Sequence, residues 1–204
     1  MKIPSKQRNA ERSRQAIVQA AEELFAARGT RQVSLAEIAE RAGVSRGLPS
    51  YFFGDKQKLS QTVMERAAEN LRAAVFDPIR ASHQMNPAEI LSDLIDRYVD
   101  YLAANPHVVK LLQWYLLERD ADSETHGPDI PANVLSEGVD LLADRVGSKV
   151  ISGIEVIDLL RSIVAMCLFP LRHVPLKKSE QAASFRRHKG HIKEMAMRAI
   201  RERK

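Results

Sequence analysis

The residues best suited to chemistry lie in one short segment, residues 45–56, which reads SRGLPSYFFGDK. The segment offers a guanidinium, hydroxyls and an ammonium, which are groups that donate hydrogen bonds to phosphates and to base edges. Arg46 can donate two hydrogen bonds to a guanine or bind a phosphate, and Leu48 can contact a thymine methyl. Ser50 and Tyr51 can reach phosphate oxygens. Because no obvious catalytic group accompanies them, the segment predicts a nucleic-acid contact.

The segment just before it predicts the element that must position these side chains. Ser34-Leu-Ala-Glu37 matches a capping box, in which the serine and the glutamate each satisfy a backbone donor of the first helical turn. We predict a short helix from about Leu35, a break at Gly43, and a second helix that Ser45 caps at once. Two such helices form a helix-turn-helix, whose second helix fits a DNA major groove about 12 Å wide.

Three further positions extend the predicted contact surface. Ser34 and Lys56 stand at the N-termini of neighbouring helices, where backbone N–H groups and the helix dipole favour a phosphate. Gly47 allows the helix to approach DNA closely. An ordinary helical hairpin is the alternative, but a core would not leave Arg46, Ser50 and Lys56 on one exposed edge. The predicted DNA-binding residues are Ser34, Ser45, Arg46, Gly47, Leu48, Ser50, Tyr51 and Lys56.

Charge is distributed unevenly along the 204 residues. The formal charge is +5 over residues 1–60, −7 over residues 61–174 and +7 over residues 175–204, which together give the net +5. A basic start on an acidic body suggests that the start meets a polyanion, because Lys and Arg near phosphates release condensed counterions. Charge alone does not distinguish basic ends that bind a polyanion from basic ends that only keep the protein soluble. The helix-turn-helix pattern favours the first.

Several classes of protein are disfavoured by the composition. No run approaches the roughly 18 apolar residues that span a bilayer. The first residues lack the apolar middle of a secretory signal, so we expect a cytoplasmic protein with no membrane partner. The single cysteine, Cys167, excludes an intramolecular disulfide and a multi-cysteine zinc site.

An enzyme is the competing class, and the residues give it little support. Cys167 lies among apolar residues with no histidine at a nearby helical spacing, which is typical of a buried apolar side chain and not of a nucleophile. His188, His191 and Glu194 follow one another at intervals of three and could hold a metal, but only His188 falls in the apolar seam of its helix. We therefore expect no catalytic residues, no metal and no cofactor.

Almost every segment has helical periodicity and strand signals are absent, so we predict an all-α fold of about nine helices. Gly29 ends the first helix as a left-handed stop, and Asp55 can cap a long helix. Asn86-Pro87 and Asn105-Pro106 open two more. Beyond the helix-turn-helix, the helices are expected at about 8–28, 56–81, 86–104, from 106, at 132–146, 152–172 and 179–203, with a loop at 119–131.

Two helices differ from the others in how they present apolar residues. The helix over residues 154–171 is apolar over most of its circumference and must be covered on several sides. The last helix carries a narrow apolar seam flanked by charge, which suits packing against another helix. Burial within the chain is the alternative to a dimer interface built from this pair. The predicted interface residues are Ile157, Leu160, Val164, Leu171, Phe185, His188, Ile192, Met195 and Ala199.

In combination, the N-terminal motifs resemble the DNA-binding domain of the TetR (tetracycline-repressor) family of bacterial transcriptional regulators. The resemblance runs from about Arg14 to Leu59, through IVQAAEELFAARG, VSLAEIAERAGVSRG and YFFGDKQKL, and covers about a quarter of the chain. The family pattern places a lysine three residues after its final phenylalanine, and Phe53 and Lys56 obey that spacing. Further along, YLAANPHVVKLL and CLFPLRH resemble one branch of the family more loosely.

One tripeptide departs from the family pattern. Most members have a threonine, an apolar residue and a tyrosine after the recognition-helix glycine, where this chain has Leu48, Pro49 and Ser50. The tyrosine that usually binds a phosphate is absent from its place, so the role passes to Tyr51. Pro49 fixes one φ and removes one N–H, which is tolerable early in a helix. We expect the operator preference to differ from that of relatives at this tripeptide.

The resemblance implies a homodimer that binds a near-palindromic double-stranded operator and is released by a small-molecule effector, with repression as the family habit. It implies a helix-turn-helix DNA-binding domain with a basic arm over residues 1–55 and an effector-binding and dimerisation domain over residues 56–204. A protein-interaction adaptor that uses the helical body alone stays an alternative. A pocket in the body would be lined by aromatic, polarizable or polar residues, with plain core packing the alternative for each. The candidates are Tyr98, Tyr101, His107, Trp114, Tyr115, Met166 and Cys167.

Overall fold

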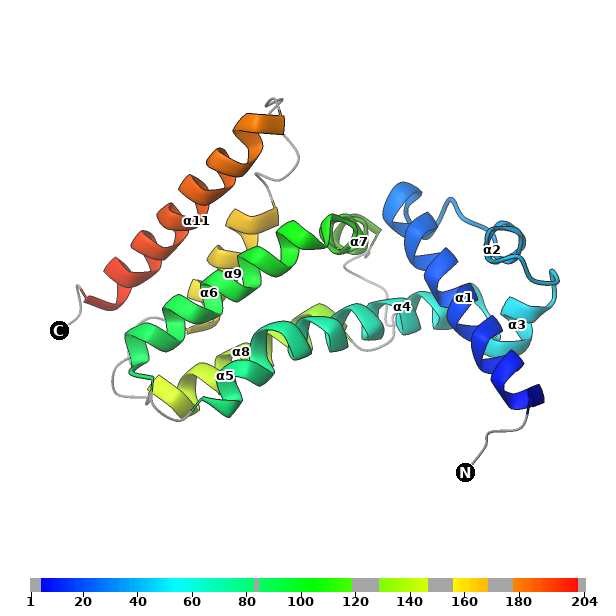
Figure 1. Cartoon of the computed structure of the whole chain (residues 1–204), viewed down its shortest axis with the longest axis horizontal. Helices are drawn as coiled ribbons and strands as arrows, with labels where there is room; N and C mark the ends of the chain where they lie inside the picture. The colour runs from blue at the N-terminus through cyan, green and yellow to red at the C-terminus, as the bar shows by residue number, and fades with distance from the viewer. Residues whose placement is uncertain (1–4, 83–84, 119–128, 147–155, 169–177, 202–204) are drawn as a thin grey trace. The chain divides into compact units, whose positions relative to one another are not determined.

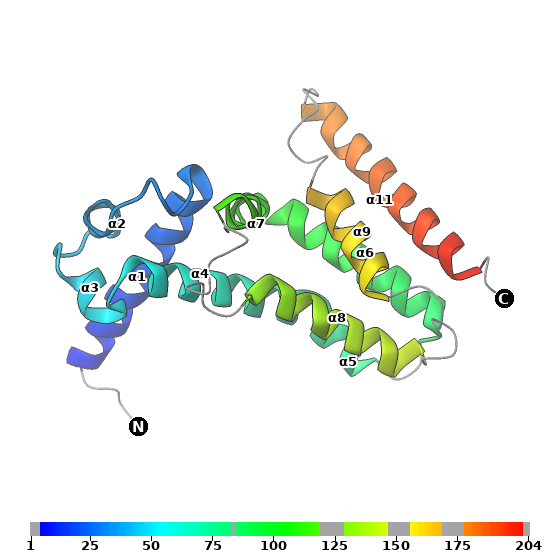
Figure 2. The same ribbon diagram turned by 180° about the vertical axis from the view of Figure 1, so that it is seen from behind.

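The computed structural model describes residues 5–82, 85–118, 129–146, 156–168 and 178–201, and these ranges are helical apart from short connections (Figures 1 and 2). They contain no strand, which agrees with the predicted all-α fold. No helix in these ranges is long and apolar enough to cross a membrane. The predicted loop at 119–131, apart from its last three residues, and the predicted capping box at 152–155 lie outside the described residues.

The N-terminal helices begin and end close to the predicted positions. They are α1 (Ser5–Arg28), α2 (Leu35–Ala42), α3 (Leu48–Phe53) and α4 (Lys56–Leu71). Gly29 follows α1 with φ of +79°, a left-handed conformation that a residue without Cβ adopts at no steric cost. Its N–H donates to the Phe25 carbonyl at 2.9 Å and closes the last turn of α1.

The helix predicted over residues 56–81 is continuous but changes its winding. After α4 the chain passes into a π-helical turn, η1 (Arg72–Phe76), and then into α5 (Asp77–Ala81). The N–H of Asp77 donates to the Arg72 carbonyl, five residues back. The next residue, Pro78, has no N–H to donate, and its ring would crowd the carbonyl four residues earlier. Widening the preceding turn accommodates that ring.

The remaining described helices are α6 (Pro87–Ala104), α7 (Pro106–Glu118), α8 (Ile130–Val146), α9 (Val156–Leu168) and α11 (Lys178–Arg201). Asn86 caps α6 as predicted, with its side-chain oxygen accepting from Ala88 and Glu89 N–H at 3.0 Å. When α4, η1 and α5 are taken as one continuous helix, the described ranges hold nine helices, the number predicted.

The chain forms two compact units. The N-terminal unit comprises residues 1–67 and 107–129, and the body unit comprises residues 68–106 and 130–204. Helix α7 therefore belongs with α1, α2 and α3, and the division falls inside α4. The predicted boundary between residues 55 and 56 separates a DNA-binding part from an effector-binding part, and it stays a prediction. The compact units are divided at other positions, after residue 67 and around residues 107–129.

Each unit has an apolar core. In the N-terminal unit, α1 and α2 pack together through side chains that are almost fully buried, among them Ile17, Phe25 and Ile38. In the body unit, α8 packs against η1 and α9. Gly138 makes that packing close, because a Cβ at this position would lie 3.3 Å from Leu160 Cδ1 and 3.5 Å from the Phe76 ring.

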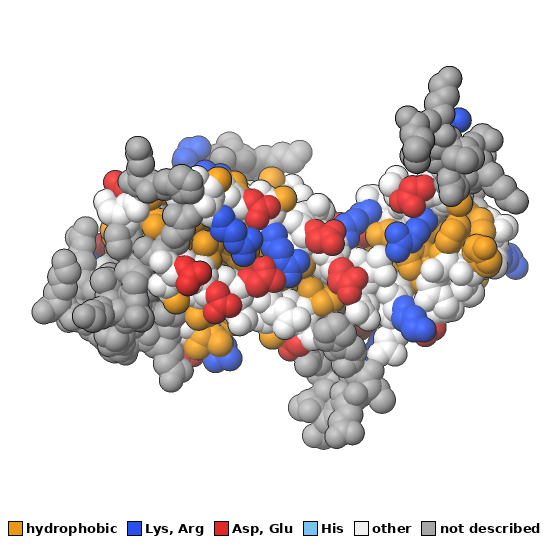
Figure 3. Space-filling model, turned by 90° about the horizontal axis from the view of Figure 1, so that it is seen from below, with side chains coloured by type: hydrophobic (Ala, Val, Ile, Leu, Met, Phe, Trp, Pro, Cys, Tyr) orange, Lys and Arg blue, Asp and Glu red, His pale blue; other side chains and the backbone are white. Residues whose placement is uncertain are grey.

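Ion pairs hold the outer surface of the body unit. The Arg72 guanidinium donates to both oxygens of Glu137, with Nη2 2.6 Å from Oε1 and Nε 2.7 Å from Oε2, and so joins η1 to α8. Arg80 lies 3.8 Å from the same carboxylate. This bidentate contact lowers the pKa of Glu137 and raises that of Arg72. Figure 3 shows acidic and basic side chains interspersed over one face of this unit.

Candidate nucleic-acid interface

The helix-turn-helix is present at the predicted residues. The Ser34 hydroxyl oxygen accepts from the Glu37 N–H at 3.2 Å, and the Ser34 N–H donates to Glu37 Oε2 at 2.8 Å, so the capping box of α2 is complete. Gly43 ends α2 with φ of +66°, and its N–H donates to the carbonyls of Ala39 and Glu40. The chain then turns into α3.

Ser45 does not cap α3, contrary to the prediction. The helix begins at Leu48, its N-cap is Gly47, and no side chain caps it. With Ser45 as N-cap, residue 49 would be the first whose N–H must bond the Ser45 carbonyl, and Pro49 has none. The Leu48 N–H bonds that carbonyl instead, at 3.0 Å, in a tighter turn. Arg46 thus lies in the turn before the six-residue helix.

The recognition segment has one exposed and one buried side. Tyr51 is 80% exposed, and Ser45, Arg46, Gly47 and Ser50 are exposed as well, so five of the predicted contact residues are accessible. Pro49 and Phe53 are buried. The Arg14 guanidinium lies 5.4 Å from the centre of the Phe53 ring, a cation–π contact that joins α3 to α1. Leu48 is half-buried.

The two helix N-termini predicted to bind phosphate are less open than the segment between them. Both donors of Ser34, its N–H and its hydroxyl, go to Glu37 Oε2 at 2.8 Å, so a phosphate would have to displace that carboxylate. The Lys56 ammonium donates to the Arg31 carbonyl at 3.3 Å, which leaves two of its three protons to other acceptors. Asp55 accepts from the Lys58 N–H at 2.8 Å and caps α4 as predicted.

The Glu37 carboxylate predicts an acid-dependent stability. Hydrogen bonds from the Ser34 backbone, then from the Ser34 hydroxyl and Arg28, lower the pKa of Glu37 from 4.5 to about 2. A carboxylate whose pKa is lowered by folding stabilises the folded state. This contribution to the free energy of unfolding is complete above about pH 4.5 and is lost as the pH falls towards 2. Thermal unfolding of the wild type and of Glu37→Gln should therefore differ at pH 6 and converge near pH 2. Glu40→Gln, an exposed change on the same helix, should track the wild type; a constant Glu37→Gln difference would contradict the assignment.

Residues 17–63 match the family model described as bacterial regulatory proteins, tetR family. The chain is thus similar to the tetR family of bacterial regulatory proteins over a segment that contains the helix-turn-helix. It is 36% identical over 93 residues to the transcriptional repressor BepR of Brucella suis, a match that covers 46% of this chain and 44% of BepR. The chain therefore spans less than half the length of this curated relative.

Solved structures resemble this chain over a larger share of its length. NalD of Pseudomonas aeruginosa, a repressor of a multidrug efflux pump, superposes with a TM-score of 0.61 at 23% identity, covering 93% of this chain and 96% of NalD. AibR, solved in complex with isovaleryl coenzyme A and operator DNA, gives 0.64 at 17% identity, covering 90% and 97%. At these identities the likeness establishes the fold.

The seven predicted pocket residues divide between the two units. Tyr98, Tyr101, Met166 and Cys167 belong to the body unit, where burial raises the pKa of both tyrosines and raises that of the Cys167 thiol to about 12. The thiol is buried and stays protonated at neutral pH, as expected for an apolar core residue. His107, Trp114 and Tyr115 belong to the N-terminal unit.

The three in the N-terminal unit already have partners. His107 Nε2 lies 2.9 Å from Glu22 Oε1, and the Arg66 guanidinium donates to the other oxygen of that carboxylate. Burial, and then the nearby Arg66 charge, lower the pKa of His107, so the imidazole is neutral at pH 7. Trp114 packs against the backbone of Gly29, and the Tyr115 hydroxyl lies 3.1 Å from Asp129 Oδ1.

The predicted dimer residues of α9 and α11 require correction. Ile192 is fully buried and Leu160 is 6% exposed within a single chain, so neither can add surface to a partner. Met195 is 46% exposed, and Ile157 and Val164 are half-buried. His188 Nε2 lies 2.8 Å from the Met166 carbonyl. Leu171 lies outside the described residues, and the structure does not describe the side chains of Phe185 and Ala199.

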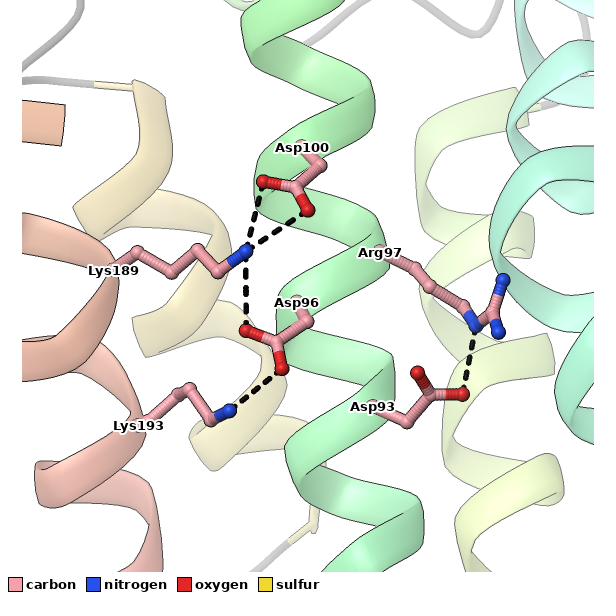
Figure 4. Close-up of polar contacts among 6 residues, drawn as sticks. All are labelled: Asp93, Asp96, Arg97, Asp100, Lys189 and Lys193. Carbon is pink, nitrogen blue, oxygen red and sulfur yellow. Dashed lines mark hydrogen bonds and ion pairs between the residues drawn. The ribbon is translucent and has the colours of Figure 1, made fainter. Parts of the chain in front are cut away.

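An ion-pair cluster joins α11 to α6 (Figure 4). The Lys189 ammonium lies 2.8 Å from Asp100 Oδ1 and 3.2 Å from Asp96 Oδ1, and the Lys193 ammonium lies 2.6 Å from Asp96 Oδ2. These contacts clamp α11 to α6. Burial acts to raise the pKa of Asp96, but the two ammonium groups lower it overall. The residues recur at i and i+4 on each helix, and this spacing is the sequence signal that could have indicated the contact.

The described residues contain no group of three His, Cys, Asp or Glu side chains arranged to hold a metal. His188 and His191 lie on different sides of α11, since His191 is exposed and His188 is directed at α9. The N-terminal unit has two other sets of polar groups. One is the set of exposed side chains in the recognition segment, and the other is the set of contacts among Glu22, Arg66 and His107 that link α1, α4 and α7.

Proposed function

We propose that this protein is a transcriptional regulator that binds a near-palindromic DNA operator as a homodimer and represses transcription until a small molecule releases it. The observation that carries the proposal is the recognition segment, in which Arg46, Ser50 and Tyr51 are exposed beside the N-terminus of α4. BepR, a repressor by name, and AibR, solved with operator DNA, support it by analogy. A protein with this role works in the cytoplasm, where the bacterial chromosome lies.

The proposal assigns DNA contacts to groups of fitting chemistry. Arg46 can pair with a guanine edge or a phosphate, and the exposed Tyr51 hydroxyl can donate to a phosphate. Ser45 and Gly47 are exposed residues in the turn before α3. A six-residue recognition helix offers few base contacts. Two heads related by a two-fold axis would double them, which is the physical complement of an inverted repeat.

The dimer proposed here uses surface that remains accessible on the body unit. Leu160 and Ile192 are assigned to the core, and the proposed interface comprises Ile157, Val164 and Met195 with their exposed neighbours on α9 and α11. The effector site is proposed within the body unit near Tyr98, Tyr101, Met166 and Cys167. His107, Trp114 and Tyr115 are left out of it because they make the contacts described above.

A DNA titration tests the proposal. Wild-type protein should bind a site selected from random double-stranded DNA, the site should contain two inverted halves, and log K should fall steeply with log salt. Arg46→Ala should weaken binding by about 1–3 kcal/mol for each head, because it removes a base or phosphate contact. Arg198→Ala, which removes the same charge from an exposed position of α11, should bind as the wild type does.

Two outcomes would count against this function. A salt slope near zero would favour the adaptor, which uses the helical body without DNA. A single asymmetric half-site would argue against the homodimer while leaving DNA binding in place.

A further inference from the structure

The end of α7 carries a carboxylate with an unusual pair of partners. Glu118 Oε2 accepts from the Thr30 N–H at 3.0 Å, and Glu118 Oε1 accepts from the Arg31 N–H at 3.1 Å. The Arg31 guanidinium donates back to the Glu118 carbonyl at 2.8 Å. One acidic residue thus holds two successive backbone groups of the loop between α1 and α2, eighty-seven and eighty-eight positions away in the sequence. Hydrogen bonds to a charged group are stronger than neutral ones.

The loop that Glu118 holds is in turn the support of Lys56. The Arg31 carbonyl accepts from the Lys56 ammonium at 3.3 Å, so a chain of contacts runs from Glu118 through Arg31 to the first residue of α4. All of these residues belong to the N-terminal unit. The loop has little room to shift, because a Cβ on Gly29 would overlap Glu118 Oε1 and lie 2.8 Å from Trp114.

We infer that Glu118 is a positioning residue for DNA binding: it fixes the Thr30–Arg31 backbone on which the Lys56 ammonium is held for a phosphate. The inference rests on the proposed function. It makes α7 part of the DNA-binding head, although α7 follows the recognition helix by more than fifty residues. A displacement of α7 would then alter the position of Lys56 through the hydrogen bonds of Glu118 and Arg31.

Electrostatic repulsion and a positioning role predict changes of opposite sign in DNA affinity when Glu118 is removed. A carboxylate in a basic head repels phosphates, so its neutralisation should strengthen DNA binding. A positioning role predicts weaker binding, because the loop and Lys56 lose their fixed arrangement. The sign of the change therefore distinguishes the two effects.

The experiment uses full-length Glu118→Gln and Glu118→Ala protein and the selected double-stranded DNA site, with fluorescence anisotropy at several salt concentrations. Binding should be about tenfold weaker at equal salt, since hydrogen bonds to a charged group are lost. The salt slope should become shallower by about 1.8 if each of two heads loses one phosphate contact. Glu65→Gln, an equal charge change at an exposed position of α4, should bind as tightly as the wild type or more tightly.

A double-mutant cycle separates positioning from general stability. In a Lys56→Ala background, Glu118→Gln should have no further effect on the salt slope, because the contact it positions is already absent. Thermal unfolding supplies the folded fraction of each variant. If Glu118→Gln only lowers the unfolding temperature, while its folded fraction binds DNA with wild-type affinity and slope, the inference is overturned. Wild-type protein without salt-dependent binding would remove the proposed function and the inference together, whereas normal wild-type binding with an unaffected variant removes the inference alone.

Discussion

Replacement of Gly29 by alanine is expected to destabilise the protein by about 3 kcal/mol, the sum of a backbone cost and an overpacking cost. Gly29 has φ of +79°, which side chains other than glycine rarely adopt. A methyl group there would also overlap Glu118 Oε1 and press against Trp114. Both costs act at the joint between α1 and α7. Urea unfolding followed by the fluorescence of Trp114, the single tryptophan, measures the change in the N-terminal unit.

Two other glycines separate these costs. Gly43 has a similar φ of +66°, but a Cβ added there would meet no atom within 4 Å, so Gly43→Ala should cost about 1 kcal/mol from the backbone alone. Gly190 lies inside α11 with open space around it, so Gly190→Ala should stabilise by up to about 1 kcal/mol through helix propensity. Circular dichroism follows all three variants. If Gly29→Ala lowers the free energy of unfolding by no more than Gly43→Ala does, the contacts with Glu118 and Trp114 do not destabilise the variant.

Gly29 illustrates how far local sequence patterns reach. A glycine after the last apolar residue of a helix predicts a left-handed stop, and the structure has one there. The contact with Trp114 and Glu118 could not be predicted in this way, because it joins residues more than eighty positions apart. Capping boxes, proline positions and helical periodicity are local signals, and they located α2, α4 and α6 within a few residues.

The start of α3 was predictable but was predicted incorrectly. Ser45 is a good N-cap residue in isolation, and the interpretation gave it that role. The fourth helical position after Ser45 must donate its N–H, and Pro49 cannot. Applying this rule along the segment excludes Ser45 as the N-cap and moves the start to a later residue, and the structure has it at Leu48.

Two residues of the predicted dimer interface, Leu160 and Ile192, are buried within the chain for a different reason. Periodicity shows that α9 and α11 carry apolar residues, but it does not say whether those residues face their own chain or a partner. The ion pairs between Lys189, Lys193, Asp96 and Asp100 join α11 to α6, and in this arrangement Ile192 is buried while Met195 stays accessible. Such a choice depends on how distant helices meet, which one helix taken alone cannot indicate.

Glu22→Ala is expected to destabilise the protein by about 2–3 kcal/mol, because it breaks a largely buried charge network. Glu22 is 5% exposed; one of its oxygens accepts from Arg66 and the other lies 2.9 Å from His107 Nε2. Burial lowers the pKa of Arg66, but the guanidinium stays charged, so removal of Glu22 leaves that partly buried charge without its carboxylate. The Arg66 side chain is 32% exposed, which keeps the expected loss below that of a fully buried pair.

The next residue supplies the matched control. Glu23 pairs with Arg41, but both side chains are largely exposed, at 42% and 60%, so Glu23→Ala should cost less than about 1 kcal/mol. Urea unfolding of both variants, with Arg66→Ala and the Glu22→Ala/Arg66→Ala double variant, yields a coupling energy that we expect at about 1–2 kcal/mol. Equal costs at residues 22 and 23, or a coupling near zero, would mean that the Glu22–Arg66 pair adds nothing to the apolar contacts between α1 and α4. A measured coupling would instead show a polar link between these two helices, through a carboxylate that also lies beside His107 of α7.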